Sequence, residues 1–200
     1  RDTDRSRGLG DVYKRQDKEL IKGLIAEYQQ FVKSVSFVKR AVTLSDNFNY
    51  VFVGLRRVGK SYLMYQQIHH LIETGISPEE ILFFNFEDER IAGMDTEHLD
   101  MIKRCYEEMY SHRPIFFLDE IQIVPHWEQF VRRLADQKYR VYVTGSNAKM
   151  LSKDIATTLG GRFMIQYVYP FSFREYLSSN GVQLDKLWIY KNRSEVVRHF

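Results

Sequence analysis

The sequence contains a single cysteine and no apolar run of the roughly 20 residues that a bilayer-spanning helix needs. Cys105 has no partner for an internal disulfide bond, so we expect the chain to work in a reducing, cytoplasmic setting. No charged segment followed by an apolar one opens the chain, as a secretory signal would. We therefore expect neither a disulfide-stapled protein nor association with a membrane.

The chain also has little net charge. Its 29 Lys and Arg residues against 26 Asp and Glu give a formal charge of +3, and most of that excess lies in residues 1–16. A folded part this balanced gives no electrostatic case for tight non-specific binding to nucleic acid. With 44% hydrophobic and 28% charged residues among 200, the composition is that of a globular protein with one domain and an appended piece.

Both ends of the chain differ from the middle. Residues 1–16, RDTDRSRGLGDVYKRQ, show no apolar periodicity and resemble translated linker sequence, so we set them aside as a non-native tail; a genuine polar tail is the alternative. The other end, RSEVVRHF, stops inside a helix-like pattern without a stop signal. We expect a fragment whose downstream domain is missing.

Between the ends, segments with helical spacing alternate with short apolar runs. Helices are predicted over residues 17–34, 60–74 and 96–110, with another beginning at Trp127. The apolar runs predict five strands: YVFVG, ILFFNFE, PIFFLDE, RVYVTGS and RFMIQYVY. Because the strands alternate with helices and are apolar on both faces, we predict an α/β fold whose parallel sheet is covered by helices on each side. The predicted organisation is a helical segment at 17–48, a core at 49–170 and the start of a truncated helical region at 171–200.

The segment from Gly54 to Ser61, GLRRVGKS, matches the pattern G-x-x-x-x-G-K-[ST], known as Walker A, at every fixed position. It follows a predicted strand and opens a predicted helix, which is the context that the pattern requires. Glycines let successive N–H groups point at one anion, and the helix N-terminus favours negative charge. Lys60 can reach the β- and γ-phosphates, and the Ser61 hydroxyl can ligate Mg²⁺. We expect nucleotide to contact Gly54, Arg57, Val58, Gly59, Lys60, Ser61 and Tyr62.

Two carboxylates follow the apolar run IFFL, in the manner of a Walker B strand. The carboxyl ends of parallel strands are where ligands bind in open α/β sheets, so Asp119 is placed to hold Mg²⁺. Glu120 is placed to orient and polarise a water for attack on the γ-phosphate. A glutamate directly after the aspartate favours hydrolysis over transfer of phosphate to a bound substrate.

The sequence leaves the roles of four further features undecided. Ser146 or Asn147, after the fourth strand, can sense the γ-phosphate or form a plain turn. Arg162 can offset transition-state charge, in cis or from a neighbouring subunit, or serve as a structural arginine. Arg56 and Arg57 lie inside the phosphate loop and can touch phosphate or pair with acidic neighbours. The acidic residues 87–89 end the second strand and are expected in a solvated loop or a partner contact, away from the phosphate loop.

Taken together, these motifs resemble the AAA-type ATP-binding proteins of bacteria and archaea that carry a C-terminal domain of unknown function. The resemblance runs from about Lys39 to Leu177 and rests on GLRRVGKS, LDEIQIVPHWEQFVRRL, TGSNAKML and YPFSFREYL. It implies a three-layer P-loop NTPase fold with strand order 5-1-4-3-2, and it implies ATP and Mg²⁺ as ligands. By position it implies roles for Lys60 and Ser61 (phosphate loop), Asp119 and Glu120 (metal and water), Ser146 (sensor) and Arg162 (the arginine before the last strand).

The expected function is Mg²⁺-dependent ATP hydrolysis coupled to an unknown partner domain. The alternative is a nucleotide-dependent binding switch with little turnover, associated with nucleic acid only through a missing C-terminal domain. The lid of the resembling family is absent or only begun here, so this fragment can bind nucleotide poorly or fail to turn it over. Assembly into a homo-oligomer is left open.

Overall fold

A computed structural model of the chain describes residues 2–146 and 157–181. Its centre is a five-stranded sheet in which every strand pair is parallel and the order is β2-β3-β4-β1-β5. Read from the other edge this is 5-1-4-3-2, so the predicted fold class and strand order are confirmed. The strands are β1 (Asn49–Gly54), β2 (Ile81–Asn85), β3 (Ile115–Asp119), β4 (Val141–Ser146) and β5 (Phe163–Tyr167).

The strand register brings residues that are far apart in sequence to one edge of the sheet. Gly54 at the end of β1 pairs with Ser146 at the end of β4, and Asn85 at the end of β2 pairs with Asp119 at the end of β3. All strand ends therefore point the same way. The phosphate loop and the two predicted carboxylates meet at this carboxyl edge.

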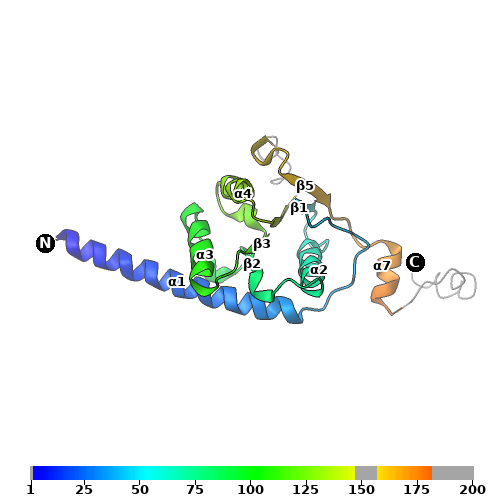
Figure 1. Cartoon of the computed structure of the whole chain (residues 1–200), viewed down its shortest axis with the longest axis horizontal. Helices are drawn as coiled ribbons and strands as arrows, with labels where there is room; N and C mark the ends of the chain where they lie inside the picture. The colour runs from blue at the N-terminus through cyan, green and yellow to red at the C-terminus, as the bar shows by residue number, and fades with distance from the viewer. Residues whose placement is uncertain (1, 147–156, 182–200) are drawn as a thin grey trace, which may run out of the picture.

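Five α-helices are described: α1 (Asp2–Ser34), α2 (Lys60–Glu73), α3 (Thr96–Met109), α4 (Trp127–Asp136) and α7 (Phe173–Ser179). Short 3₁₀ helices lie at Pro78–Glu80, Glu89–Ile91 and Ile121–Ile123. The predicted helices at 17–34, 60–74 and 96–110 and the helix at Trp127 are all present. Helix α1 also continues through residues 2–16, and Figure 1 shows its N-terminal part projecting beyond the rest of the molecule.

Helices cover both faces of the central strands (Figure 1). The ring of Tyr65 on α2 packs against Phe83 of β2, whereas Phe130 on α4 packs edge-on against Phe116 of β3. Because successive side chains of a strand point to opposite faces, the register of Phe83 with Phe117 places α2 and α4 on opposite sides. Helix α1 runs past β2 and contacts both α2 and α3. The result is the predicted three-layer arrangement.

Stacked aromatic rings fill the middle of the sheet face that α2 covers. Phe117 of β3 stacks on Tyr142 of β4 at 4.5 Å and 3°, and Tyr142 stacks on Tyr50 of β1 at 5.9 Å and 10°. These rings are buried and lie side by side across three adjacent strands. Such contacts fix the relative positions of the strands whose ends carry the site.

The edge strand β5 differs from the prediction that every strand is covered on both faces. Met164 and Ile165 point to opposite faces, yet 50% and 47% of their surfaces are exposed. The physical reason is position: β5 pairs only with β1, and the described helices pack over the other four strands. No described helix is long and apolar enough to cross a bilayer.

Candidate nucleotide-binding site

The phosphate loop connects the end of β1 to the start of α2 and depends on glycine at two positions. A Cβ on Gly54 would lie 2.4 Å from the carbonyl oxygen of Val168, so only glycine fits there. Gly59 is the N-cap of α2 with φ +92°, a backbone region that favours glycine. No side chain caps α2, and its first turn holds no acidic residue. The free N–H groups of that turn are therefore available to an anion.

The Lys60 side chain is folded into the loop. It is 4% exposed, and its Nζ donates to the carbonyls of Leu55 at 3.1 Å and Gly54 at 3.4 Å. The same Nζ lies 3.3 Å from Oε1 of Glu120. The ammonium group thus joins the phosphate loop to the end of β3, as expected for a residue that holds phosphate between them.

Asp119 is buried at the end of β3, beside two hydroxyl groups. Thr144 of β4 donates to its Oδ1, and the nearby Ser61 hydroxyl favours its charged form and so lowers its pKa. Thr144 Oγ1 in turn accepts the backbone N–H of Glu120 at 2.8 Å. The structure therefore brings the predicted metal pair, Ser61 and Asp119, together. Thr144 was missed in the sequence; a hydroxyl inside the apolar run VYVTG was its only signal.

Glu120 has a left-handed backbone conformation, with φ 52° and ψ 37°, and its side chain contacts Lys60 of the phosphate loop. Its Oε2 accepts a hydrogen bond from Gln122 Nε2 at 2.5 Å, while Oε1 faces Lys60. Oε1 of Gln122 is buried and has no partner among the described residues. Sequence reasoning missed Gln122, although it lies in the quoted motif LDEIQ. Its amide orients the glutamate that is predicted to activate water.

Glu87 corrects the expectation that the acidic residues after β2 lie away from the phosphate loop. It lines a cavity of about 450 Å³ together with Arg56, Arg57, Gly59, Lys60, Ser61, Tyr62 and Glu120. Its Oε1 lies 3.2 Å from Nη2 of Arg56, whose side chain is 83% exposed. Although β2 is the far edge strand, the chain after it turns back across the end of β3. Arg56 thus pairs with an acidic neighbour, one of its two predicted alternatives.

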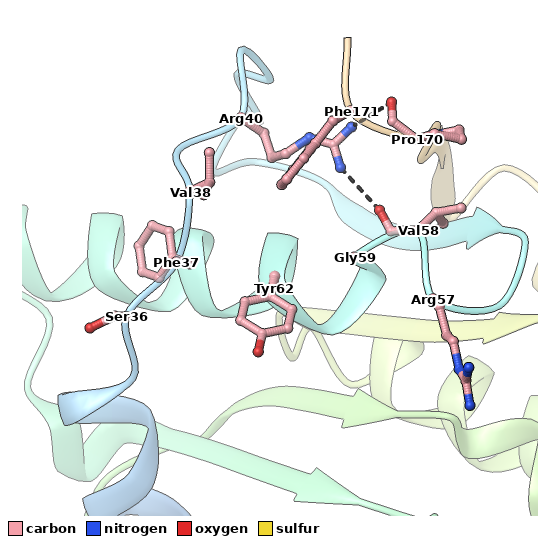
Figure 2. Close-up of a pocket in the computed structure, with 10 residues that line it drawn as sticks. All are labelled: Ser36, Phe37, Val38, Arg40, Arg57, Val58, Gly59, Tyr62, Pro170 and Phe171. Carbon is pink, nitrogen blue, oxygen red and sulfur yellow. Dashed lines mark hydrogen bonds between the residues drawn. The ribbon is translucent and has the colours of Figure 1, made fainter. Parts of the chain in front are cut away.

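A second, larger cavity of about 680 Å³ adjoins the first and shares Arg57, Gly59 and Tyr62 with it. Its remaining lining is mostly apolar. Besides Val58 of the phosphate loop, it comes from the segment before β1 and the segment after β5: Ser36, Phe37, Val38, Arg40, Pro170 and Phe171. Figure 2 shows Phe37, Tyr62 and Phe171 around this space, with the Arg57 side chain directed away from Phe37. Of this remaining lining, Val58 was predicted as a nucleotide contact, whereas no sequence pattern predicted the others, because they lie in irregular segments.

The other two predicted site residues are Ser146 and Arg162. Ser146 is the last residue of β4 and pairs with Gly54, so its backbone lies at the carboxyl edge; Asn147 lies outside the described residues. Arg162 immediately precedes β5, at the amino ends of the strands and so away from their carboxyl ends. It donates to Asp136 at 2.5 Å. Arg162 therefore does not reach the phosphate loop of its own chain. Of the alternatives for Arg162, the pair with Asp136 fits a structural arginine, and a contact from a neighbouring subunit stays a prediction.

Burial raises the pKa of the Asp119 carboxyl to about 6 from 3.8, against the opposing effect of the Thr144 and Ser61 hydroxyls. Because this pKa is raised, the protonated carboxyl contributes stability that is complete below pH 3.8 and lost as pH rises through 6. At neutral pH the ionised Asp119 carboxylate lowers the stability of the folded state. A cation bound beside the carboxylate would offset this loss of stability, as expected of a metal ligand.

Asp119→Asn is therefore expected to raise the free energy of unfolding at pH 8 by about 1 to 2 kcal/mol, since it removes a buried charge. Urea denaturation of the nucleotide-free chain in EDTA, between pH 4 and 8, measures this. The gain should shrink toward pH 4, where the wild-type carboxyl becomes protonated. Asp100→Asn, in an exposed pair with Arg133, is the control and should show no such gain. A less stable Asp119→Asn variant at pH 8 would contradict the argument.

Comparison with known proteins supports the assignment of family. A family model described as an AAA domain matches residues 46–177, more than half of the chain. An uncharacterized protein from Methanocaldococcus jannaschii is 30% identical over 184 residues, covering 91% of this chain and 40% of that protein. One from Haemophilus influenzae is 34% identical over 168 residues, covering 82% and 42%. The chain thus spans about two fifths of the length of these relatives.

Solved structures give a weaker likeness. AMPPCP-bound DnaA from Aquifex aeolicus aligns with a TM-score of 0.45 and 15% identity, covering 84% of this chain and 52% of that one. Hsp104 from S. cerevisiae, in complex with casein, aligns with a TM-score of 0.45 and 16% identity, covering 65% and 25%. The assignment rests instead on the matched family, the strand order and the phosphate loop. On these grounds the chain belongs to the AAA domain family and is a P-loop ATPase domain of the AAA type.

Proposed function

We propose that this domain binds ATP with Mg²⁺ and hydrolyses it to ADP and phosphate. The observation that carries the proposal is the convergence of Lys60, Asp119 and Glu120 at the mouth of the phosphate loop. Lys60 Nζ lies 3.3 Å from the Glu120 carboxylate, and the Ser61 hydroxyl at the start of α2 lies near enough to the Asp119 carboxylate to lower its pKa. Lys60, Ser61 and Glu120 thus border one cavity of about 450 Å³, and Asp119 lies buried next to Glu120.

The phosphates would lie on the N-terminus of α2, where uncapped N–H groups and Lys60 offset their charge. The residues present also fit a magnesium ion. Ser61 and Asp119 supply the oxygen ligands that Mg²⁺ prefers, and the raised pKa of Asp119 favours a cation beside it. No group of three or more His, Cys, Asp or Glu side chains that could hold a metal occurs among the described residues, so phosphate oxygens and water would complete the shell. When bound, Mg²⁺ would neutralise charge on the β- and γ-phosphates.

Glu120 is the residue proposed to act on water. Its carboxylate would accept a proton as the water oxygen bonds to the γ-phosphorus and the bond to the β–γ bridging oxygen breaks. That bridging oxygen leaves with ADP, and the other product is inorganic phosphate. Gln122 fixes the direction of the carboxylate through Oε2.

The adjoining apolar cavity is the proposed place for the nucleoside. It shares Arg57, Gly59 and Tyr62 with the phosphate cavity, so one ligand can extend from one into the other. The exposed Tyr62 and the rings of Phe37 and Phe171 offer apolar surface to a base. At about 680 Å³ this cavity lies within the usual range for small-molecule sites.

A nucleotide-dependent switch with little turnover is the second candidate, and one observation favours it. Both carboxylate oxygens of Glu120 are engaged here, one by Lys60 and one by Gln122. A carboxylate held this way is a poor base until Lys60 moves to phosphate. We also propose that the domain is coupled to a partner domain and works in the cytoplasm. In a homo-oligomer, Arg162 would reach the nucleotide site of the neighbouring subunit. Nothing in the balanced charge of the chain favours nucleic acid.

The test of the proposed function has two measurements. Calorimetric titration of the 200-residue chain with ATP, with Mg²⁺ and with EDTA, should show binding that Mg²⁺ strengthens. Phosphate release should be measured on a chain extended to the length of the relatives, at several protein concentrations. A specific activity that rises with concentration would support a residue supplied by a neighbouring subunit. Absence of ATP binding in the presence of Mg²⁺, in the extended chain as well as in this one, would overturn the proposal.

A further inference from the structure

Arg40 is a buried cation that joins four segments of the chain beside the nucleotide cavity. It lies between α1 and β1 and is only 8% exposed. Its Nη1 donates to the carbonyl of Val58 in the phosphate loop at 3.1 Å, and its Nη2 to the carbonyl of Tyr169 at 2.7 Å. Its Nε donates to Oε1 of Glu175 on α7 at 2.9 Å. The guanidinium also lies over the Phe171 ring, 5.0 Å from its centre (Figure 2).

The backbone of Arg40 is fixed as firmly as its side chain. Gln66 of α2 accepts the Arg40 N–H at 2.6 Å and donates to its carbonyl at 3.1 Å. The planar fork of an arginine can hold several acceptors at set angles, which a lysine cannot do. Gln66 on α2 therefore holds Arg40 in place beside the phosphate loop. Arg40 in turn holds α7 in place relative to α2 and the phosphate loop.

On the other side of the junction, Glu175 does two things at once. Its Oε1 accepts from Arg40, while its Oε2 accepts the backbone N–H of Ser172 at 2.8 Å as part of a capping box. The carboxylate thus both begins α7 and ties it to Arg40. The residues leading into α7, Pro170 and Phe171, form part of the wall of the apolar cavity. Glu175 itself lines neither that cavity nor the phosphate cavity.

We propose that Arg40 is a positioning residue that couples occupancy of the nucleotide site to the position of α7. A nucleotide in the two cavities contacts the phosphate loop on one side of Arg40 and the Pro170–Phe171 segment on the other. Both sides are bonded to one guanidinium, so ordering either one orders the other. By linkage, the effect is reciprocal: whatever moves α7 changes nucleotide affinity by the same factor by which nucleotide stabilises α7. This inference rests on the proposed binding of ATP.

The experiment compares Arg40→Lys and Glu175→Gln with the wild-type chain, using ATP and Mg²⁺ as the probe. Calorimetry should show the Kd for ATP increased about tenfold in both variants, a usual size for coupling between sites. Hydrogen exchange of the α7 amides, Phe173–Ser179, should slow on ATP binding in the wild type and respond much less in Arg40→Lys. Exchange in β1, β3 and β4 reports whether each variant is folded.

Arg90→Lys is the matched control, since Arg90 also bonds two carboxylates, of Asp88 and Glu27, but lines neither cavity. It should leave the Kd for ATP unchanged. The proposal is overturned if folded Glu175→Gln binds ATP like the wild type, or if wild-type α7 exchanges at the same rate with and without ATP. Should Arg40→Lys not fold, Glu175→Gln and the wild-type exchange decide alone. A wild-type chain that binds no ATP, in the extended form as well as in this one, would instead refute the proposed function.

Discussion

Lys60→Ala is expected to weaken ATP binding at least about a hundredfold, because two charge-assisted hydrogen bonds to phosphate contribute about 3 kcal/mol together. The ammonium of Lys60 is buried, and among the described residues its partners are loop carbonyls and Glu120, which leave it close to the anion position. The other cations that line the cavity do not replace it. Arg56 is 83% exposed and bound to Glu87, and the Arg57 side chain is exposed as well. Calorimetric titration with ATP and Mg²⁺ measures the loss.

The control for Lys60→Ala is Lys33→Ala, which removes an exposed lysine from the last turn of α1. It should leave ATP affinity as in the wild type and exclude an effect of net charge alone. Thermal unfolding in the absence of nucleotide should show that Lys60→Ala is folded. A folded Lys60→Ala variant with wild-type affinity would mean that the loop from Gly54 to Ser61 does not bind the phosphates.

The sequence predicts those parts of the site that are formed by residues adjacent in the chain. The phosphate loop and the pair Asp119–Glu120 each follow an apolar strand, and their chemistry depends on local spacing and on being at a strand end. The strand order could not be predicted from the apolar segments alone, because they do not indicate that β4 lies between β1 and β3. It came from the resemblance to a family, and the structure confirms it.

The parts that the sequence does not predict depend on which segments meet in space. Glu87 follows the far edge strand and reaches the cavity only because the chain folds back over β3. Thr144 matters because β4 lies next to β3 and presents its hydroxyl to Asp119. Arg40 stands in an irregular segment, 135 positions from the glutamate that it binds. Arg162 shows the converse: its motif is recognisable, but it lies at the amino end of β5, where its guanidinium binds Asp136.

Glu120→Gln is expected to keep ATP binding and to lower phosphate release by about a hundredfold or more, as loss of a general base usually does. Glutamine has nearly the same shape and can still accept the hydrogen bond from Gln122 Nε2, so the surroundings change little. It cannot take a proton from water. Loss of the charge facing Lys60 also frees that cation for phosphate, so affinity should stay equal or increase. Glu107→Gln, at an exposed position on α3, is the matched control.

The same variant distinguishes the two candidate functions, because Glu120 has a different role in each. In a hydrolase the glutamate acts on water, so the wild type must release phosphate much faster than Glu120→Gln at saturating ATP and Mg²⁺. In a switch with incidental turnover the glutamate serves mainly as the partner of Lys60 and Gln122, and both proteins should release phosphate at one low rate. Equal rates with intact binding would therefore reject hydrolysis as the function and keep the nucleotide-dependent switch. The measurement belongs on a chain extended to the length of the relatives, since this one spans about two fifths of them.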